Sequence, residues 1–130
     1  MGGKRFLFEH FDGYSKAYNP QGTLKASEYI LPVDDCSIDM VVCASLFTHL
    51  LEPDCIHYLM EIRRVLKPGG KSIISIHTQP VPGQPFSGDE ARIDIEKQYF
   101  TKLVRAARLD VLEEVGVVYG QDLFVLETLQ

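Results

Sequence analysis

The side chains best suited to chemistry follow an apolar run in the middle of the chain. The run starts at Ile38 and ends at Ala44, and Ser45, Thr48 and His49 come soon after it. Nearly continuous apolar residues are typical of a strand covered on both faces of a parallel sheet. Ligands of open α/β sheets bind at the carboxyl ends of such strands. Histidine titrates near neutral pH, so His49 is a candidate base or substrate contact, and its alternative role is to cap the turn.

The other reactive residue types form no catalytic or metal-binding pattern. The cysteines, Cys36, Cys43 and Cys55, are odd in number and lack a C-x-x-C spacing, which disfavours a disulfide framework. Cys55 and His57 lie two residues apart on an expected helix and therefore face different directions, so no metal site is expected. The sequence also has neither a G-x-S-x-G elbow nor a P-loop, which disfavours a serine hydrolase and a P-loop nucleotide-binding protein.

The composition indicates one small globular domain, which we expect to span residues 1–130. The residues are 45% apolar and 24% charged, and the formal net charge is -5. The negative net charge and the lack of a cluster of basic residues disfavour nucleic acid as a partner. No apolar run approaches the roughly 20 residues that a membrane span needs. The cysteine pattern favours a reducing cytoplasm as the location.

Strands and helices that alternate along the chain must position the candidate side chains. A proline suits the first turn of a helix, and a Pro-Gly-Gly string ends one. The expected strands are a short one at 5–10, two at 38–44 and 71–77, and a C-terminal hairpin of two at 111–119 and 122–128. A helix is expected at 53–66 and a loop at 78–88. The capping-box pattern of Ser87 and Glu90 predicts a further helix that starts at Asp89, and a helical stretch follows at 101–108. This order predicts an α/β fold whose sheet is mostly parallel, with one antiparallel strand near the C-terminus.

Five short strings of this sequence occur in the order seen in one enzyme family. They are YNPQG at 18–22, LP followed by DCSID at 31–39, SLFTH at 45–49, EIRRVLKPGG at 61–70 and QDLFVL at 121–126. Each string alone is a weak signal, but their order and spacing together are specific. The sequence therefore resembles the class I S-adenosylmethionine-dependent methyltransferases of type 11.

The resemblance implies a fold, a cofactor and a set of site residues. The fold is a partial Rossmann-like methyltransferase sheet with a C-terminal antiparallel hairpin, and the cofactor is S-adenosylmethionine, used on a small-molecule substrate. By the same resemblance, Asp12 and Ser45 lie near the cofactor, while Thr48, His49 and His77 line the substrate pocket, with His49 as the candidate catalytic residue. Ordinary turn chemistry explains Asp12 as well, since a glycine follows it.

The sequence departs from the family at its first cofactor-binding elements. The family holds the donor with a D/E-x-G-x-G-x-G turn and, one strand later, with an acidic residue on the ribose. Neither element precedes the strand expected at 5–10. The chain thus resembles only the C-terminal part of the family, and two functions stay open. One is a truncated methyltransferase that is not competent alone, and the other is a non-catalytic methyltransferase-like module that self-associates or binds a partner chain.

The missing elements have a consequence for the strand at 38–44. In the family this strand lies beside the first strand, so here it becomes an edge. Natural edges carry charge, proline or bulges, and this strand is too apolar to be a comfortable one. We therefore expect one of two partners for its free backbone groups, namely the segment 5–10 folded back beside it or a second copy in a symmetric homodimer.

Overall fold

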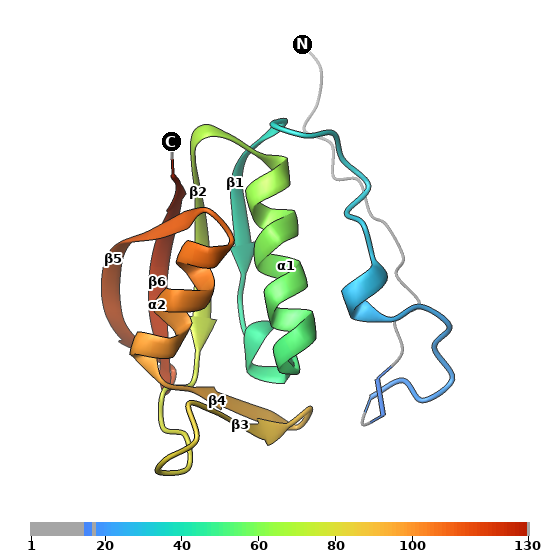
Figure 1. The fold of residues 1–130 in the computed structure, drawn as a ribbon, viewed down its shortest axis with the longest axis vertical. Coiled ribbons are helices and arrows are strands. Elements are labelled where there is room, and N and C mark those ends of the chain that lie inside the picture. The colour runs from blue at the N-terminus through green and yellow to red at the C-terminus, as the bar shows by residue number, and fades with distance from the viewer. Residues whose placement is uncertain (1–14, 17, 130) are drawn as a thin grey trace.

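The computed structural model describes residues 15–16 and 18–129, and its elements are labelled in Figure 1. Two helices, α1 (Glu52–Val65) and α2 (Lys97–Ala106), accompany six strands. The strands are β1 (Ile38–Cys43), β2 (Leu66–Ile76), β3 (Phe86–Asp89), β4 (Arg92–Ile95), β5 (Leu109–Val118) and β6 (Gln121–Thr128). Two short 3₁₀ turns, Ala26–Glu28 and Phe47–His49, precede α1. The strand expected at 5–10 lies outside the described residues.

A four-stranded sheet in the order β1-β2-β6-β5 forms the centre of the molecule. β1 and β2 run parallel, and β6 runs antiparallel to both β2 and β5. Since β5 therefore points the same way as β1 and β2, three strands share one direction and only β6 opposes them. The α/β class, the mostly parallel sheet and the C-terminal antiparallel hairpin are confirmed.

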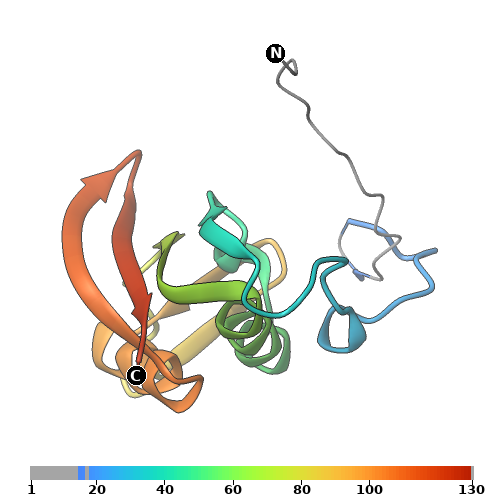
Figure 2. The same ribbon diagram turned by 90° about the horizontal axis from the view of Figure 1, so that it is seen from above.

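The two helices cover the same face of the sheet, as Figure 2 shows from above. The buried side of α1 carries Cys55, Leu59 and Ile62, three or four residues apart, as the periodicity predicted. Met40 and Val42 of β1 point away from the helices, and these residues are 53% and 61% exposed. Within the part of the chain that the structure describes, the second face of the sheet thus has no cover near β1.

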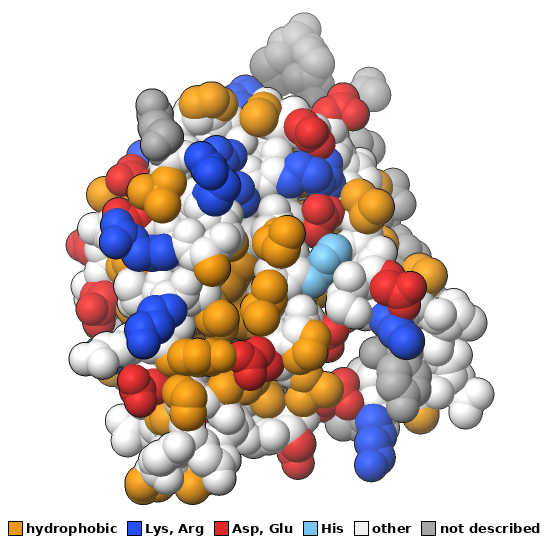
Figure 3. All heavy atoms as spheres, viewed as in Figure 1, with side chains coloured by type: hydrophobic (Ala, Val, Ile, Leu, Met, Phe, Trp, Pro, Cys, Tyr) orange, Lys and Arg blue, Asp and Glu red, His pale blue; other side chains and the backbone are white. Residues whose placement is uncertain are grey.

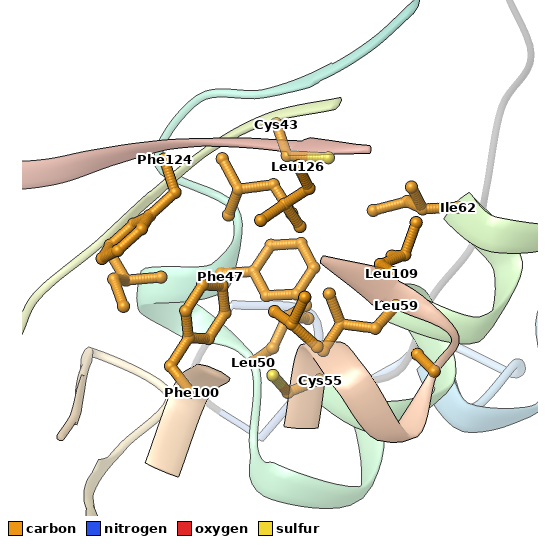
Figure 4. Close-up of a cluster of buried hydrophobic side chains, with 14 of the residues drawn as sticks. Cys43, Phe47, Leu50, Cys55, Leu59, Ile62, Phe100, Leu109, Phe124 and Leu126 are labelled. Carbon is orange, nitrogen blue, oxygen red and sulfur yellow. The ribbon is translucent and has the colours of Figure 1, made fainter. Parts of the chain in front are cut away.

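The hydrophobic core lies between this sheet and the helices (Figure 4). Its three largest side chains are Phe47, Phe100 and Phe124, which come from the turn after β1, from α2 and from β6 and are fully buried. The rings of Phe100 and Phe124 lie with their centroids 5.2 Å apart in a tilted arrangement. The core therefore ties the turn that follows β1 to the C-terminal half of the chain.

The helix expected to start at Asp89 is absent, and that prediction was wrong. Residues 86–95 form the hairpin of β3 and β4, in which Gly88 pairs with Ile93. Gly88 has a φ of +109°, outside the helical region, and a Cβ atom there would lie 2.0 Å from the Arg92 carbonyl oxygen. The hydroxyl of Ser87 accepts the N–H of Val81 instead of capping a helix. Cross-strand pairing overrides the local capping-box signal, and α2 starts only at Lys97.

The other expected boundaries lie within a few residues of the observed ones. β1 ends at Cys43, one residue before the expected end, and α2 starts four residues before the expected start. Regular pairing of β2 with β1 begins at Lys71, because the Pro68-Gly69-Gly70 string interrupts the register between Ile38 and Met40. No helix among the described residues is long and apolar enough to cross a membrane.

Candidate functional site

A cavity of about 310 Å³ opens beside the turn that follows β1. Four parts of the chain line it: the segment before β1, the turn and 3₁₀ helix after β1, helix α1 and the β3–β4 hairpin. The lining residues are Ser15, Tyr18, Asn19, Ala26, Leu46, His49, Leu50, Asp54, Tyr58 and Glu90. This volume lies at the lower end of the range that small-molecule sites occupy.

Ser45 and Thr48 hold the turn and do not line the cavity. Ser45 has a φ of +56°, which is uncommon for a residue with a side chain. Its N–H donates to Ser75 Oγ at 2.9 Å, and Gln121 Nε2 donates to its hydroxyl at 3.0 Å. Thr48 is buried and its hydroxyl donates to the Ser45 carbonyl oxygen at 3.0 Å. These bonds position the following 3₁₀ helix, and with it His49.

The hydrogen bonds of His49 determine which of its ring nitrogens is available. Its Nδ1 lies 2.9 Å from the backbone carbonyl oxygen of Glu90. A carbonyl oxygen only accepts, so Nδ1 carries the proton in the neutral ring and Nε2 carries the lone pair. The Tyr18 hydroxyl lies 3.4 Å from the same Nδ1, and the two rings meet edge to face with centroids 5.4 Å apart. In the neutral ring Nε2 of His49 thus holds the lone pair, and no described residue hydrogen-bonds to it.

Two carboxylates and a second tyrosine complete the polar wall. Burial and the nearby Glu90 carboxylate raise the pKa of Asp54, although the N–H of Ser27 partly offsets this. Glu90 Oε1 accepts the N–H of Lys16 at 2.9 Å. Burial, together with Tyr29 and Asp54, raises the pKa of Tyr58 to about 12, so the phenol stays protonated at neutral pH. The wall therefore offers hydrogen-bond donors and acceptors around the imidazole.

His77 lies elsewhere, just beyond the end of β2. It forms an isolated bridge with Asp94, and its carbonyl oxygen accepts the N–H of Ile95 at 2.8 Å. Its Nδ1 is buried without a hydrogen-bond partner. Asp12, the remaining candidate, lies outside the described residues. Of the four described residues among those singled out from the sequence, only His49 lines the cavity.

Sequence reasoning missed Asp54, Tyr58 and Glu90, which line the cavity together with His49. Asp54 and Tyr58 are four residues apart on α1 and so share one face of the helix, a signal that the sequence contains. No comparable signal existed for Glu90. It reaches His49 only because the β3–β4 hairpin folds back toward the turn after β1, a contact between residues 41 apart.

A larger cavity of about 660 Å³ lies at the start of α2, and the one lysine that lines it is paired with two carboxylates. Lys97 Nζ lies 3.2 Å from a carboxylate oxygen of Glu114 and 3.6 Å from one of Asp122. The Thr78 hydroxyl donates to Asp122 as well. No histidine lines this cavity, and we favour the smaller one beside His49.

The described residues do not by themselves fit S-adenosylmethionine, the cofactor that the resemblance implies. The backbone of a glycine-rich turn after a strand is what approaches the donor in that family. The turn after β1 has the sequence Ala44-Ser45-Leu46, and the described glycines with positive φ lie in other turns and strands. Among the described residues, moreover, no group of three side chains is placed to hold a metal ion.

Comparison with known proteins gives a family match and one curated relative. Residues 10–74, half of the chain, match the family described as "Methyltransferase domain". A probable S-adenosylmethionine-dependent methyltransferase of Mycolicibacterium smegmatis is 31% identical over 101 residues, which cover 75% of this chain. The chain spans 38% of the length of that relative.

Solved structures share the fold at lower sequence identity. A 1,6-didemethyltoxoflavin-N1-methyltransferase of Burkholderia thailandensis, solved with 1,6-didemethyltoxoflavin and S-adenosylhomocysteine, matches with a TM-score of 0.62 at 19% identity, over 82% of this chain and 49% of that one. A chain from the complex that contains the Haloferax volcanii Trm112 methyltransferase activator matches with a TM-score of 0.60 at 19% identity, over 77% of this chain and 58% of that one. At such identities the likeness concerns the fold alone.

Proposed function

Because the chain belongs to the methyltransferase domain family, we propose that it provides the acceptor side of an S-adenosylmethionine-dependent methyltransfer site for a small molecule. The supporting observation is His49, which lines a cavity at the carboxyl end of β1 and whose Nδ1 faces the Glu90 carbonyl oxygen, so that the lone pair of the neutral ring lies on Nε2. A hydroxyl or amine acceptor must lose a proton when it is methylated. His49 Nε2 is the group that takes this proton, and Asp54 and Tyr58 orient the acceptor.

The donor side of the site comes from residues that the described part of the chain lacks. No glycine-rich turn follows a described strand, so we propose that the chain alone does not hold S-adenosylmethionine. Two comparisons support a site whose donor half is supplied by further polypeptide. The chain spans 38% of its curated relative, and one structural relative comes from a complex with a methyltransferase activator.

A non-catalytic module is the second candidate function, and the open side of the sheet favours it. Met40 and Val42 are more than half exposed on a face that the two helices leave bare. A module of this kind would bind a second copy or another chain through that side and would need no donor. The net charge of -5 argues against nucleic acid in either function. The three unpaired cysteines are compatible with the cytoplasm, where we place the protein.

A measurement of donor binding distinguishes both proposed functions from an enzyme that transfers methyl groups on its own. In calorimetric titration of the purified chain with S-adenosylmethionine, we expect no measurable heat and no shift in melting temperature. Donor binding with a micromolar dissociation constant would contradict the proposed lack of a donor site.

Acceptor binding is tested with phenol as the probe, because its acidic O–H matches an unprotonated imidazole nitrogen. In ¹⁵N–¹H correlation spectra, phenol should shift the amide signals of residues 46–50 and 54–58. The variant His49→Phe should weaken these shifts at least about tenfold, while Ser27→Ala should leave them unchanged. Shifts confined to the cavity near Lys97 would contradict the acceptor role of the His49 cavity, and so would equal shifts in the variant His49→Phe. The non-catalytic module would then be the remaining candidate function.

A further inference from the structure

The cavity beside His49 contains two carboxylates that the proton transfer does not use. Asp54 lies in the first turn of α1, and Glu90 lies at the tip of the β3–β4 hairpin, which reaches the same end of that helix (Figure 1). Both residues are half-buried, and both also line an adjoining hollow of about 200 Å³. The fold thus brings two carboxyl groups from separate elements to one wall of the proposed acceptor site.

The described residues do not neutralise these two charges. No lysine or arginine lines the cavity, and the ion pairs of the described chain involve other carboxylates. Lys16 and Lys25 line adjoining hollows, but their ammonium groups lie more than 4 Å from Asp54 and Glu90. Glu90 adds to burial in raising the pKa of Asp54. A positive charge placed between the two carboxylates would therefore relieve their repulsion.

Aromatic side chains are a second feature of the cavity that suits a cation. Tyr18, Tyr58 and the ring of His49 line it together with the carboxylates. The faces of aromatic rings attract ammonium groups. Tyr58 stays a neutral phenol at neutral pH, because its pKa is raised to about 12. Carboxylates and neutral aromatic rings around one cavity favour an amine over a neutral or an anionic molecule.

We propose that the methyl acceptor is a small molecule with an ammonium group, which binds between Asp54 and Glu90 and against Tyr58. This inference rests on the proposed acceptor role of the cavity and names the class of molecule that it takes. The ammonium group is an anchor and is not methylated, because its nitrogen has no lone pair. A separate hydroxyl group lies at His49 Nε2 and receives the methyl group. A cavity of about 310 Å³ has room for both groups.

Three probes that share a phenol ring and differ in charge test this proposal. At the end of a short side chain, tyramine carries an ammonium group, tyrosol a neutral hydroxyl and 4-hydroxyphenylacetate a carboxylate. Dissociation constants come from the amide shifts of residues 46–50 and 54–58 in ¹⁵N–¹H correlation spectra of the full chain at pH 7. We expect tyramine to bind at least about tenfold more tightly than tyrosol, the effect of one hydrogen bond between charged groups. We expect 4-hydroxyphenylacetate to bind most weakly.

The double variant Asp54→Asn/Glu90→Gln assigns the preference to these carboxylates. It removes both charges but keeps the size of the side chains and an oxygen for the N–H groups that they accept. The preference for tyramine over tyrosol should fall to about twofold or less. Glu113→Gln/Glu127→Gln, which removes two charges from β5 and β6, is the matched control and should keep the full preference. An equal fall in this control would assign the preference to the net charge of the chain and overturn the proposal.

Failure of the ammonium site and failure of the acceptor role give different results. Equal binding of tyramine and tyrosol to the cavity would overturn the ammonium site and leave the acceptor role. This is also the result expected if another part of the chain already neutralises the carboxylates. A preference for tyramine combined with unweakened binding of all three phenols in His49→Phe would support the ammonium site but contradict the acceptor role. If no probe shifts the cavity signals, both proposals are wrong.

Discussion

At the residue scale, a single backbone contact decides the chemistry open to His49. The Glu90 carbonyl oxygen accepts a hydrogen bond from Nδ1–H, which leaves the lone pair of the neutral ring on Nε2. That carbonyl lies at the tip of the β3–β4 hairpin, where the Asp89 carboxylate accepts the N–H of Ala91 and tightens the turn. The state of the imidazole thus depends on the backbone of a hairpin that lies far from it in the sequence.

Gly88 is the residue on which this hairpin depends most. In the variant Gly88→Ala, the added methyl group would meet the Arg92 carbonyl oxygen at 2.0 Å on a backbone with φ of +109°. We expect a loss of about 3 kcal/mol or more in the free energy of unfolding, measured in urea. Gly83→Ala is the control, because its φ of +83° is also unfavourable but nothing lies within 4 Å, and it should cost only about 1 kcal/mol. Equal costs would show that steric overlap is not the cause.

At the element scale, one side of α1 holds the segment that precedes β1. His57 bonds to the Tyr29 carbonyl oxygen, and Glu61 Oε1 accepts the Leu31 N–H at 2.8 Å. Arg64 donates to the carbonyl oxygens of Leu31 and Val33 and to the carboxylates of Glu61 and Asp35. His57, Glu61 and Arg64 lie four and three residues apart and so form one stripe along the helix. The segment held by this stripe continues into the wall of the His49 cavity.

Replacing Arg64 tests how far this stripe stabilises the fold. Lysine keeps the charge but cannot reach four acceptors at once, since its ammonium lacks the planar fork of arginine. We expect Arg64→Lys to lower the free energy of unfolding by about 1–2 kcal/mol in urea denaturation. Arg105→Lys, at an exposed ion pair with Asp110, should change it by less than about 0.5 kcal/mol. In the Arg64 variant, residues 31–35 should also lose protection against hydrogen exchange.

At the scale of the whole molecule, the feature that matters for stability is where the charged side chains lie. Hydrophobic side chains gather around the two helices on the face seen in Figure 3, and charged side chains surround them. Two carboxylates are held well inside. A hydrogen bond from Arg64 lowers the pKa of Glu61, and one from Arg92 lowers that of Asp94. Both groups thus favour the folded state in their charged form.

These lowered pKa values predict a loss of stability in acid. A carboxylate with a lowered pKa stabilises the fold above its unfolded value, about 4, and that contribution disappears as the pH falls through the folded value. We expect the melting temperature to fall between about pH 5 and pH 3. The double variant Glu61→Gln/Asp94→Asn should melt at a lower temperature at pH 7 but decline less steeply below pH 5. A decline as steep as that of the wild type would assign acid sensitivity to other groups.

Much of the fold was predictable because its signals are local. The apolar stripe of α1, the apolar run of β1 and the turn at Gly120 between β5 and β6 each act over a few residues. The same holds for the position of His49, which follows a strand end. The capping-box pattern at Ser87 was local too, yet it failed, because pairing of Gly88 with Ile93 is a stronger constraint than a cap.

The sequence by itself determined the fold class, the four strands of the central sheet and the kind of residue that stands at the end of β1. Only the tertiary structure decided what surrounds that residue. Tyr18, Asp54 and Glu90 come from three parts of the chain, and no periodicity relates them. The physical reason is that patterns of two or 3.6 residues specify which face of an element is buried, whereas a cavity depends on how separate elements pack.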